Sequence, residues 1–200
     1  MRTSLDKGKK IAEVIESSSA EFTAQCYKLG QSPPLGSLVK TRDNSDGIYG
    51  VVCNVETHSL DPGRRVLARG ENLESEGDIF KANPQLTRLL ITDFKVIVVG
   101  HIWGNNLCHY LPPNPAPIHS FVYACRTEEV KKFTQSLDFL SLLVDIRLSI
   151  PVDDVAAACL RYASQAHSDP QAFLVKAGKE LACLLSNDTR RLNSLLKRLK

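Results

Sequence analysis

The feature that most constrains the fold is an apolar run of fifteen residues, 89–103, which reads LLITDFKVIVVGHIW. It is rich in isoleucine and valine, which favour β-strands, and it is too long for one straight strand. We therefore expect a bend or bulge near Thr92 and Asp93. An apolar strand with a free edge would pair with other chains, so this run must lie within a sheet that exposes few edges.

Shorter β-type segments surround this run. We expect them at residues 21–29, 36–42, 48–57, 66–70 and 120–126, separated by turn-forming clusters such as SPPLG, RDNSDG and DPGRR. The segment LPPNPAPIH carries four prolines, which exclude a central strand and predict a loop or edge. Six or seven short strands with regular turns are typical of a small barrel or sandwich, and closure into a barrel removes the exposed edges.

The pattern changes to helical spacing after residue 126. A first helix is expected from Thr127, with apolar residues at 3-and-4 spacing as far as Val144. Pro151 and Pro170 mark the starts of a second and a third helix, and Asn187 and Asp188 offer caps to a fourth. The predicted fold is therefore α+β, a small closed β-barrel of about six or seven strands followed by a C-terminal bundle of about four helices.

This reading divides the chain into three parts. Residues 1–19 form an N-terminal segment that is either helical or disordered, residues 20–125 form the barrel, and residues 126–200 form the helical domain. The first 22 residues lack the apolar stretch of a signal peptide, and no run approaches the length of a membrane span. We expect a soluble protein of the cytoplasm or, as the alternative, of the plastid stroma.

Two surfaces of the helical part are candidates for binding. The first helix is apolar on two faces, and its second face is a candidate contact for a protein partner or a second copy; it comprises Phe139, Leu142, Leu143 and Ile146. The last helix carries basic residues opposite its leucines, namely Arg190, Arg191, Lys197, Arg198 and Lys200. Such a face is usually solvated, and the alternatives are nucleic-acid phosphate or an anionic membrane surface. No aromatic residue lies among these basic residues, so base stacking is not supported.

The sequence lacks the common motifs of catalysis and cofactor binding. It contains no GxxxxGK[ST], GxGxxG, GxSxG, HExxH or CxxC, so we expect a non-enzymatic protein without a cofactor or a metal. The six cysteines have apolar neighbours and are expected to be buried free thiols. The net charge of +3 is too small to indicate nucleic acid or membrane by itself.

One weak alternative is a small hydrolase or metal enzyme. Cys108 and His109, with His101 and His119 nearby, are the only local concentration of metal-ligating residues, and an acidic segment lies at residues 70–78. Adjacent residues on a strand point to opposite faces, so Cys108 and His109 do not readily share an ion. The acidic segment is more simply a solvated loop.

The β-type half resembles a known family. Gly36, Leu38 and Val39 are followed through a turn by Tyr49, Gly50 and Val52. Further on, the prolines 112, 113, 115 and 117 precede Val122 and the helix start at Glu128 and Glu129. Over roughly residues 20–133 this order is similar to the HAS-barrel, the small β-barrel shared by HerA-type DNA-translocating ATPases and the catalytic-ring subunits of rotary ATP synthase. Stand-alone barrels of this kind look like proteins of cyanobacteria and plastids.

The chain departs from that family after the barrel. HAS-barrel ATPases continue into an ATPase core, whereas about 70 helical residues without a nucleotide motif follow here. The resemblance therefore implies the barrel's role in assembly and not catalysis. The leading hypothesis is an interaction or assembly module that docks a partner, such as a barrel-ring ATPase, through its barrel and the apolar helix. The alternative is a nucleic-acid-associated protein that uses the basic last helix.

Overall fold

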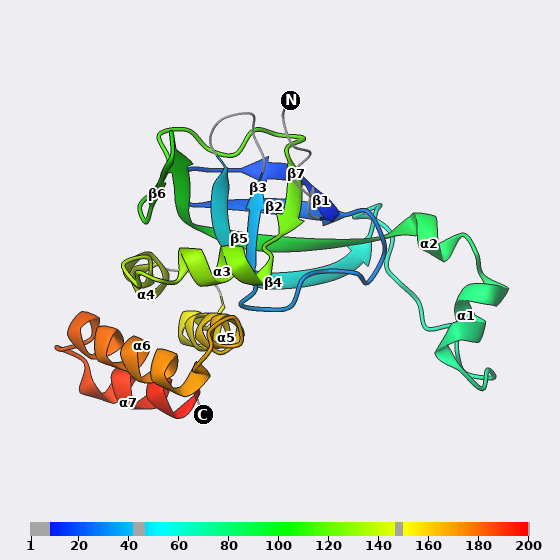
Figure 1. Cartoon of the computed structure of the whole chain (residues 1–200). Coiled ribbons are helices and arrows are strands. Elements are labelled where there is room, and N and C mark those ends of the chain that lie inside the picture. Colours follow the sequence, from blue (N-terminus) through cyan, green and yellow to red (C-terminus); the bar gives the residue numbers. More distant parts are fainter. Residues whose placement is uncertain (1–8, 42–46, 147–149, 200) are drawn as a thin grey trace.

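The computed structural model describes residues 9–41, 47–146 and 150–199. Its β part is one seven-stranded antiparallel sheet in the order β2-β1-β7-β3-β4-β5-β6 (Figure 1). Strand β2 also pairs with β5, so the sheet returns on itself and is ring-like. The strands are β1 (Lys10–Ser17), β2 (Glu21–Cys26), β3 (Leu38–Thr41), β4 (Ile48–Ser59), β5 (Leu90–Trp103), β6 (Asn106–Cys108) and β7 (Phe121–Ala124).

Five helices follow β7 and lie together on one side of the sheet (Figure 1). They are α3 (Thr127–Phe133), α4 (Leu140–Asp145), α5 (Val152–Ser164), α6 (Pro170–Leu184) and α7 (Thr189–Lys197). Helix α5 contacts β4 on one side and α6 and α7 on the other, so it joins the sheet to the outer pair of helices. The α+β class and the order of sheet before helices are confirmed.

Two further helices, α1 (Glu76–Ala82) and α2 (Leu86–Leu89), lie in the long connection between β4 and β5. This connection projects away from the sheet as an arm (Figure 1). A short β-type strand was expected at residues 66–70, and the structure has no strand there. Within the described residues, no helix is long and apolar enough to cross a membrane.

The composition of β5 follows from the two cores that it separates. Val96 and Val98 belong to the core enclosed by the ring, whereas Ile97 and Val99 belong to the core between the ring and the helices. Alternate residues of a strand face opposite sides. A strand that is buried on both sides must be apolar throughout, which explains the unbroken Ile and Val run.

The expected bend near Thr92 and Asp93 is wrong. These residues pair regularly with β4, and the register of the β4–β5 pair shifts instead at Tyr49/Gly50 and at Val52/Asn54. The first shift leaves Val99 of β5 without a paired residue and the second leaves Cys53 of β4 without one, and such bulges increase the local bending of a strand. Residues 90–103 therefore form one strand, β5, and one of the two register shifts falls on its partner strand β4.

The expectation of a helical or disordered segment over residues 1–19 is wrong for residues 10–17, which form β1. The sheet therefore begins about ten residues before the expected boundary at residue 20. Ala12 and Val14 are fully buried in the core enclosed by the ring, and β1 pairs with both β2 and β7. A register shift between Val14 and Glu16 interrupts the alternation that would have identified the strand. Residues 1–8 lie outside the described part of the chain.

The expected first helix of the C-terminal half is two helices. Helix α3 ends at Phe133 and α4 begins at Leu140, so the expectation of about four helices is low by one for the described residues. Between them the Ser136 hydroxyl donates to Asp138 Oδ2 at 2.6 Å, and its oxygen accepts from the Asp138 amide at 3.3 Å. A side chain that binds its neighbouring backbone in this way competes with the helical hydrogen bonds.

His109 lies where the ring meets the helices. Its ring centroid is 4.6 Å from that of Phe133 and 5.7 Å from that of Phe139. The Nε2 atom is buried and has no hydrogen-bond partner within the described residues. Burial lowers the pKa of His109 below 6.5, against an opposing attraction from Asp138.

His109 should make the fold sensitive to acid. The unfolded chain takes up a proton on this imidazole near pH 6.5, whereas the folded chain does so only at lower pH. The stability contributed by neutral His109 is therefore complete above this pH and is lost as the pH falls. We expect His109→Leu to reduce the loss of unfolding free energy between about pH 7.5 and about pH 5.5. Urea titrations at the two pH values measure the loss of unfolding free energy. Equal losses in the wild type and in His109→Leu would contradict a lowered pKa of His109 in the folded state.

Candidate functional site

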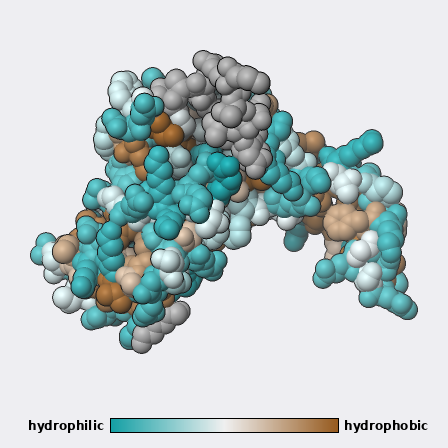
Figure 2. Space-filling model, in the orientation of Figure 1, coloured by the Kyte–Doolittle hydropathy of each residue, from teal (hydrophilic) through white to brown (hydrophobic). Residues whose placement is uncertain are grey.

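The arm formed by residues 60–89 carries several exposed apolar side chains. Neither α1 nor α2 contains a buried residue. Val66 is 53% exposed, Leu67 66% and Phe80 40%. Figure 2 shows apolar surface on this lobe, which stands apart from the rest of the molecule. Exposed apolar side chains that gather on one lobe are typical of sites of protein contact.

Only local contacts hold the arm together. The Leu60 amide donates to the Leu89 carbonyl at 2.8 Å and closes its base. The Arg69 guanidinium donates to Asn83 Oδ1 at 3.0 Å, and the Asn83 side chain in turn donates to the Ile79 carbonyl. Helices of seven and four residues are marginal in water without packing. The arm thus has defined secondary structure but no hydrophobic core of its own.

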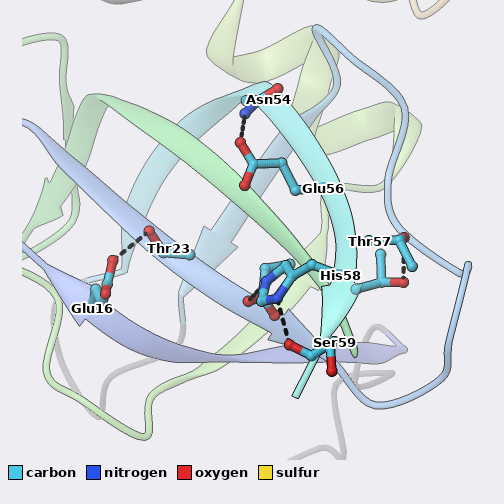
Figure 3. Close-up of polar contacts among 9 residues, drawn as sticks. Glu16, Thr23, Asn54, Glu56, Thr57, His58 and Ser59 are labelled. Carbon is cyan, nitrogen blue, oxygen red and sulfur yellow. Dashed lines mark hydrogen bonds and ion pairs between the residues drawn. The ribbon is translucent and has the colours of Figure 1, made fainter. Parts of the chain in front are cut away.

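A polar pocket of about 280 Å³ lies at the base of the arm (Figure 3). His58 on β4 and Asp93 on β5 meet there, with 3.2 Å between His58 Nε2 and Asp93 Oδ2. The second carboxylate oxygen, Oδ1, is buried and has no hydrogen-bond partner in the described residues. The pocket is lined by Ile15, Glu16, Thr23, Asn54, Glu56, His58, Asp93, Phe94 and Lys95.

The pocket combines a histidine with several carboxylates. The hydrogen bond to the Ser59 carbonyl raises the pKa of His58, burial opposes it, and Asp93 raises it further. A histidine held by a carboxylate can act as a base, but it needs a nucleophile or substrate group aligned with it. The one lining hydroxyl, on Thr23, donates to Glu16 at 3.2 Å instead. The carboxylates suit a cationic group.

The predicted partner face on the first helix does not stand free. Phe139 and Leu143 are fully buried in the core between ring and helices. Leu142 and Ile146 are half-buried, and Ile146 packs against the same core. Helix α4 lies between β5 and α5, so its second apolar face is covered by the chain itself. We correct the expectation that these four residues form an open contact.

The predicted basic face of the last helix is neutralised at two of its four described residues. Arg191 pairs with Asp153 at 2.8 Å and donates to the Val144 carbonyl at 2.8 Å, and its hydrogen bond with Asp153 raises the pKa of Arg191. Arg198 pairs with Asp154 at 2.8 Å. Both arginines therefore tie α7 to α5. Of the other predicted residues, Arg190 and Lys197 are exposed, and Lys200 lies outside the described residues.

His101 and Cys108 face each other across the β5–β6 pair, but the residues of the weak metal-site hypothesis do not gather into one site. His101 is buried and bonds the Tyr110 carbonyl at 3.1 Å, whereas His119 Nδ1 pairs with Glu13 at 2.6 Å. No three His, Cys, Asp or Glu side chains of the described residues form a group that could hold a metal. The acidic segment lies on the arm.

The cysteines agree with the expectation in four of six cases. Cys26, Cys53, Cys125 and Cys159 are buried, Cys108 is half-buried, and Cys183 is exposed. Burial raises the pKa of Cys26 and of Cys53 to about 11 and that of Cys159 to about 12. The thiols of these three residues are therefore poor nucleophiles near neutral pH.

Comparison of the chain with protein-family models and with curated proteins finds no match. The arm and the pocket at its base were both missed by sequence reasoning. A signal for the arm was present in the turn-rich stretch between two long β-type runs, which also holds Val66, Leu67 and Phe80 without any strand or helix period.

Proposed function

We propose that this chain is a non-catalytic interaction module that docks a protein partner through its arm. The observation that carries this proposal is an arm of about 30 residues with two helices and no buried residue in either helix. Ordering a chain costs roughly 1–2 kcal/mol per residue, which buried surface normally offsets. The exposed apolar side chains of the arm supply that burial when a partner covers them.

The ring-like sheet bears on the class of partner that we propose. We take it to be a small β-barrel of the HAS type, because Gly36 precedes β3, Leu38 begins it, and Tyr49 is the second residue of β4, in the order that the resemblance requires. Barrels of this type pack against other barrels, so the resemblance names barrel-ring ATPases as a class of partner. The apolar face of the first helix, covered within the chain, takes no part in this proposal.

Removal of the arm tests the proposal. Ser59 pairs with Leu90, so an Asn-Gly turn in place of residues 60–89 can close the β4–β5 hairpin. We expect the tagged full chain to recover one protein partner stoichiometrically from nuclease-treated native extract, and the shortened chain to recover none. Circular dichroism should show that the sheet remains folded in both.

A point variant provides the matched control. The triple change Val66→Ser, Leu67→Ser and Phe80→Ser should abolish recovery, whereas Val175→Ser should not. Val175 is 50% exposed on α6, on the far side of the molecule from the arm. Equal recovery by all variants would overturn the proposal, as would a catch of ribosomal or nucleoid proteins that disappears on nuclease treatment.

A further inference from the structure

The charges of the arm are separated into two consecutive segments. Residues 62–70 carry three arginines and no acidic residue, and residues 71–78 carry four acidic residues and no basic one. We call these the basic segment (Arg64, Arg65 and Arg69) and the acidic segment (Glu71, Glu74, Glu76 and Asp78). Over residues 60–89 the arm has five basic and five acidic residues, so it is neutral as a whole.

The two segments do not neutralise each other within one chain. Asp78 pairs with Lys81 at 2.7 Å, and Arg69 donates to Asn83. The side chains of the remaining five residues form no ion pair within the described part of the chain; they are Arg64, Arg65, Glu71, Glu74 and Glu76. All five lie on exposed positions, next to exposed Val66, Leu67 and Leu73.

This arrangement identifies the partner better than either charge alone. A strongly acidic partner such as nucleic acid would be repelled by the acidic segment, and a strongly basic partner would be repelled by the basic segment. A partner that carries the same two segments in the reverse direction satisfies both. In a twofold dimer each contact occurs twice, and a patch meets its own copy in that reversed orientation.

We propose that the partner of the arm is a second copy of this chain. Two arms lie antiparallel about a twofold axis, with the basic segment of each against the acidic segment of the other, and together they cover Val66, Leu67 and Phe80. This inference rests on the proposed function, because it requires the arm to be the contact surface. It goes further by stating the partner and the orientation.

Charge reversal followed by mixing tests the inference on the full chain. Arg64→Glu with Arg65→Glu changes the net charge of the basic segment from +3 to −1, and Glu71→Lys with Glu74→Lys and Glu76→Lys changes that of the acidic segment from −4 to +2. We expect the wild type to sediment as a dimer of twice 22.1 kDa and each variant as a monomer. The dissociation constant should rise by at least about tenfold for each variant. An equimolar mixture of the two variants should restore the dimer. Circular dichroism checks that these surface variants are folded.

Three results would overturn the inference. They are a wild type that remains monomeric at about 100 μM, variants that dimerise as tightly as the wild type, and a mixture that stays monomeric. If the monomeric wild type still recovers another protein through its arm, the inference fails and the proposed function stands. If the chain dimerises equally well with residues 60–89 replaced by Asn-Gly, the dimer forms through another surface and the inference fails. If this shortened chain also recovers protein partners from the extract, the proposed function fails as well.

Discussion

Gly36→Ala is expected to destabilise the fold by at least about 4 kcal/mol. A Cβ atom at this position would lie 2.5 Å from the Ala158 carbonyl carbon and 2.5 Å from the Cys159 amide nitrogen. Both atoms belong to the backbone of α5, which cannot move aside as a flexible side chain could. Gly36 also has a φ of +81°, which favours glycine. Urea titration followed by circular dichroism measures the change in unfolding free energy.

Gly30→Ala is the matched control for this prediction. Gly30 has a φ of +71°, and an added Cβ would meet no atom within 4 Å. The control should therefore show the backbone strain alone, roughly 1–2 kcal/mol. The difference between the two variants measures the close approach of the turn before β3 to α5. Equal destabilisation would show that the ring and the helices do not touch at Gly36.

The helical elements that sequence predicted best have local signals at their ends. Pro170 begins α6, and the Asp169 side chain accepts a hydrogen bond from the Ala172 amide at 2.9 Å. Asp188 caps α7 in the same way, accepting from the Arg191 amide at 2.9 Å. A cap is formed by residues within one turn, so it is visible in the sequence without knowledge of the tertiary fold.

Contacts between distant segments could not be predicted in this way. Phe139 and Leu143 are apolar whether a partner or the chain itself covers them, and only the placement of α4 against β5 and α5 shows that the chain does. Arg191 and Arg198 likewise appear as a free basic face until α5 brings Asp153 and Asp154 to them. For the candidate site, sequence therefore supplied residue types but not their neighbours.

The arm escaped prediction for a related reason. Hydrophobic periodicity indicates an element through the one face that it buries. Helices α1 and α2 bury no residue, so Phe80 and its neighbours follow no period that a core would impose. The same absence of a core makes the arm a candidate for contact with another chain.

Lys40→Met is expected to destabilise the fold by about 3–5 kcal/mol. Lys40 on β3 forms an ion pair with Glu129 on α3, and their side chains are only 10% and 18% exposed. Glu129 also accepts a hydrogen bond from the Arg126 amide at 3.0 Å, so it caps α3 while it holds this helix to the sheet. Removal of the lysine leaves a largely buried carboxylate whose remaining cation is the half-exposed Arg126 guanidinium at 3.5 Å. The measurement is urea unfolding at neutral pH.

A double-mutant cycle separates the ion pair from packing. Glu129→Gln keeps the size of the side chain and its hydrogen bond to Arg126, so in the Lys40→Met background it should recover part of the lost stability. Additive effects of the two changes would show that the side chains do not interact.

The dependence of stability on pH should be weaker in the Lys40→Met variant than in the wild type. Burial alone would raise the pKa of Glu129, but the hydrogen bonds from Lys40 and Arg126 outweigh it and lower the pKa below 4.5. The wild type therefore gains stability from Glu129 above that pH and loses it as the pH falls through the folded-state pKa. Without Lys40, burial is opposed by less, the pKa of the folded state rises, and acid costs the variant less than the wild type. The difference in unfolding free energy between the two proteins should narrow as the pH falls toward 4.5 and below. Protonation of Glu129 removes the negative charge that Lys40 neutralises in the wild type.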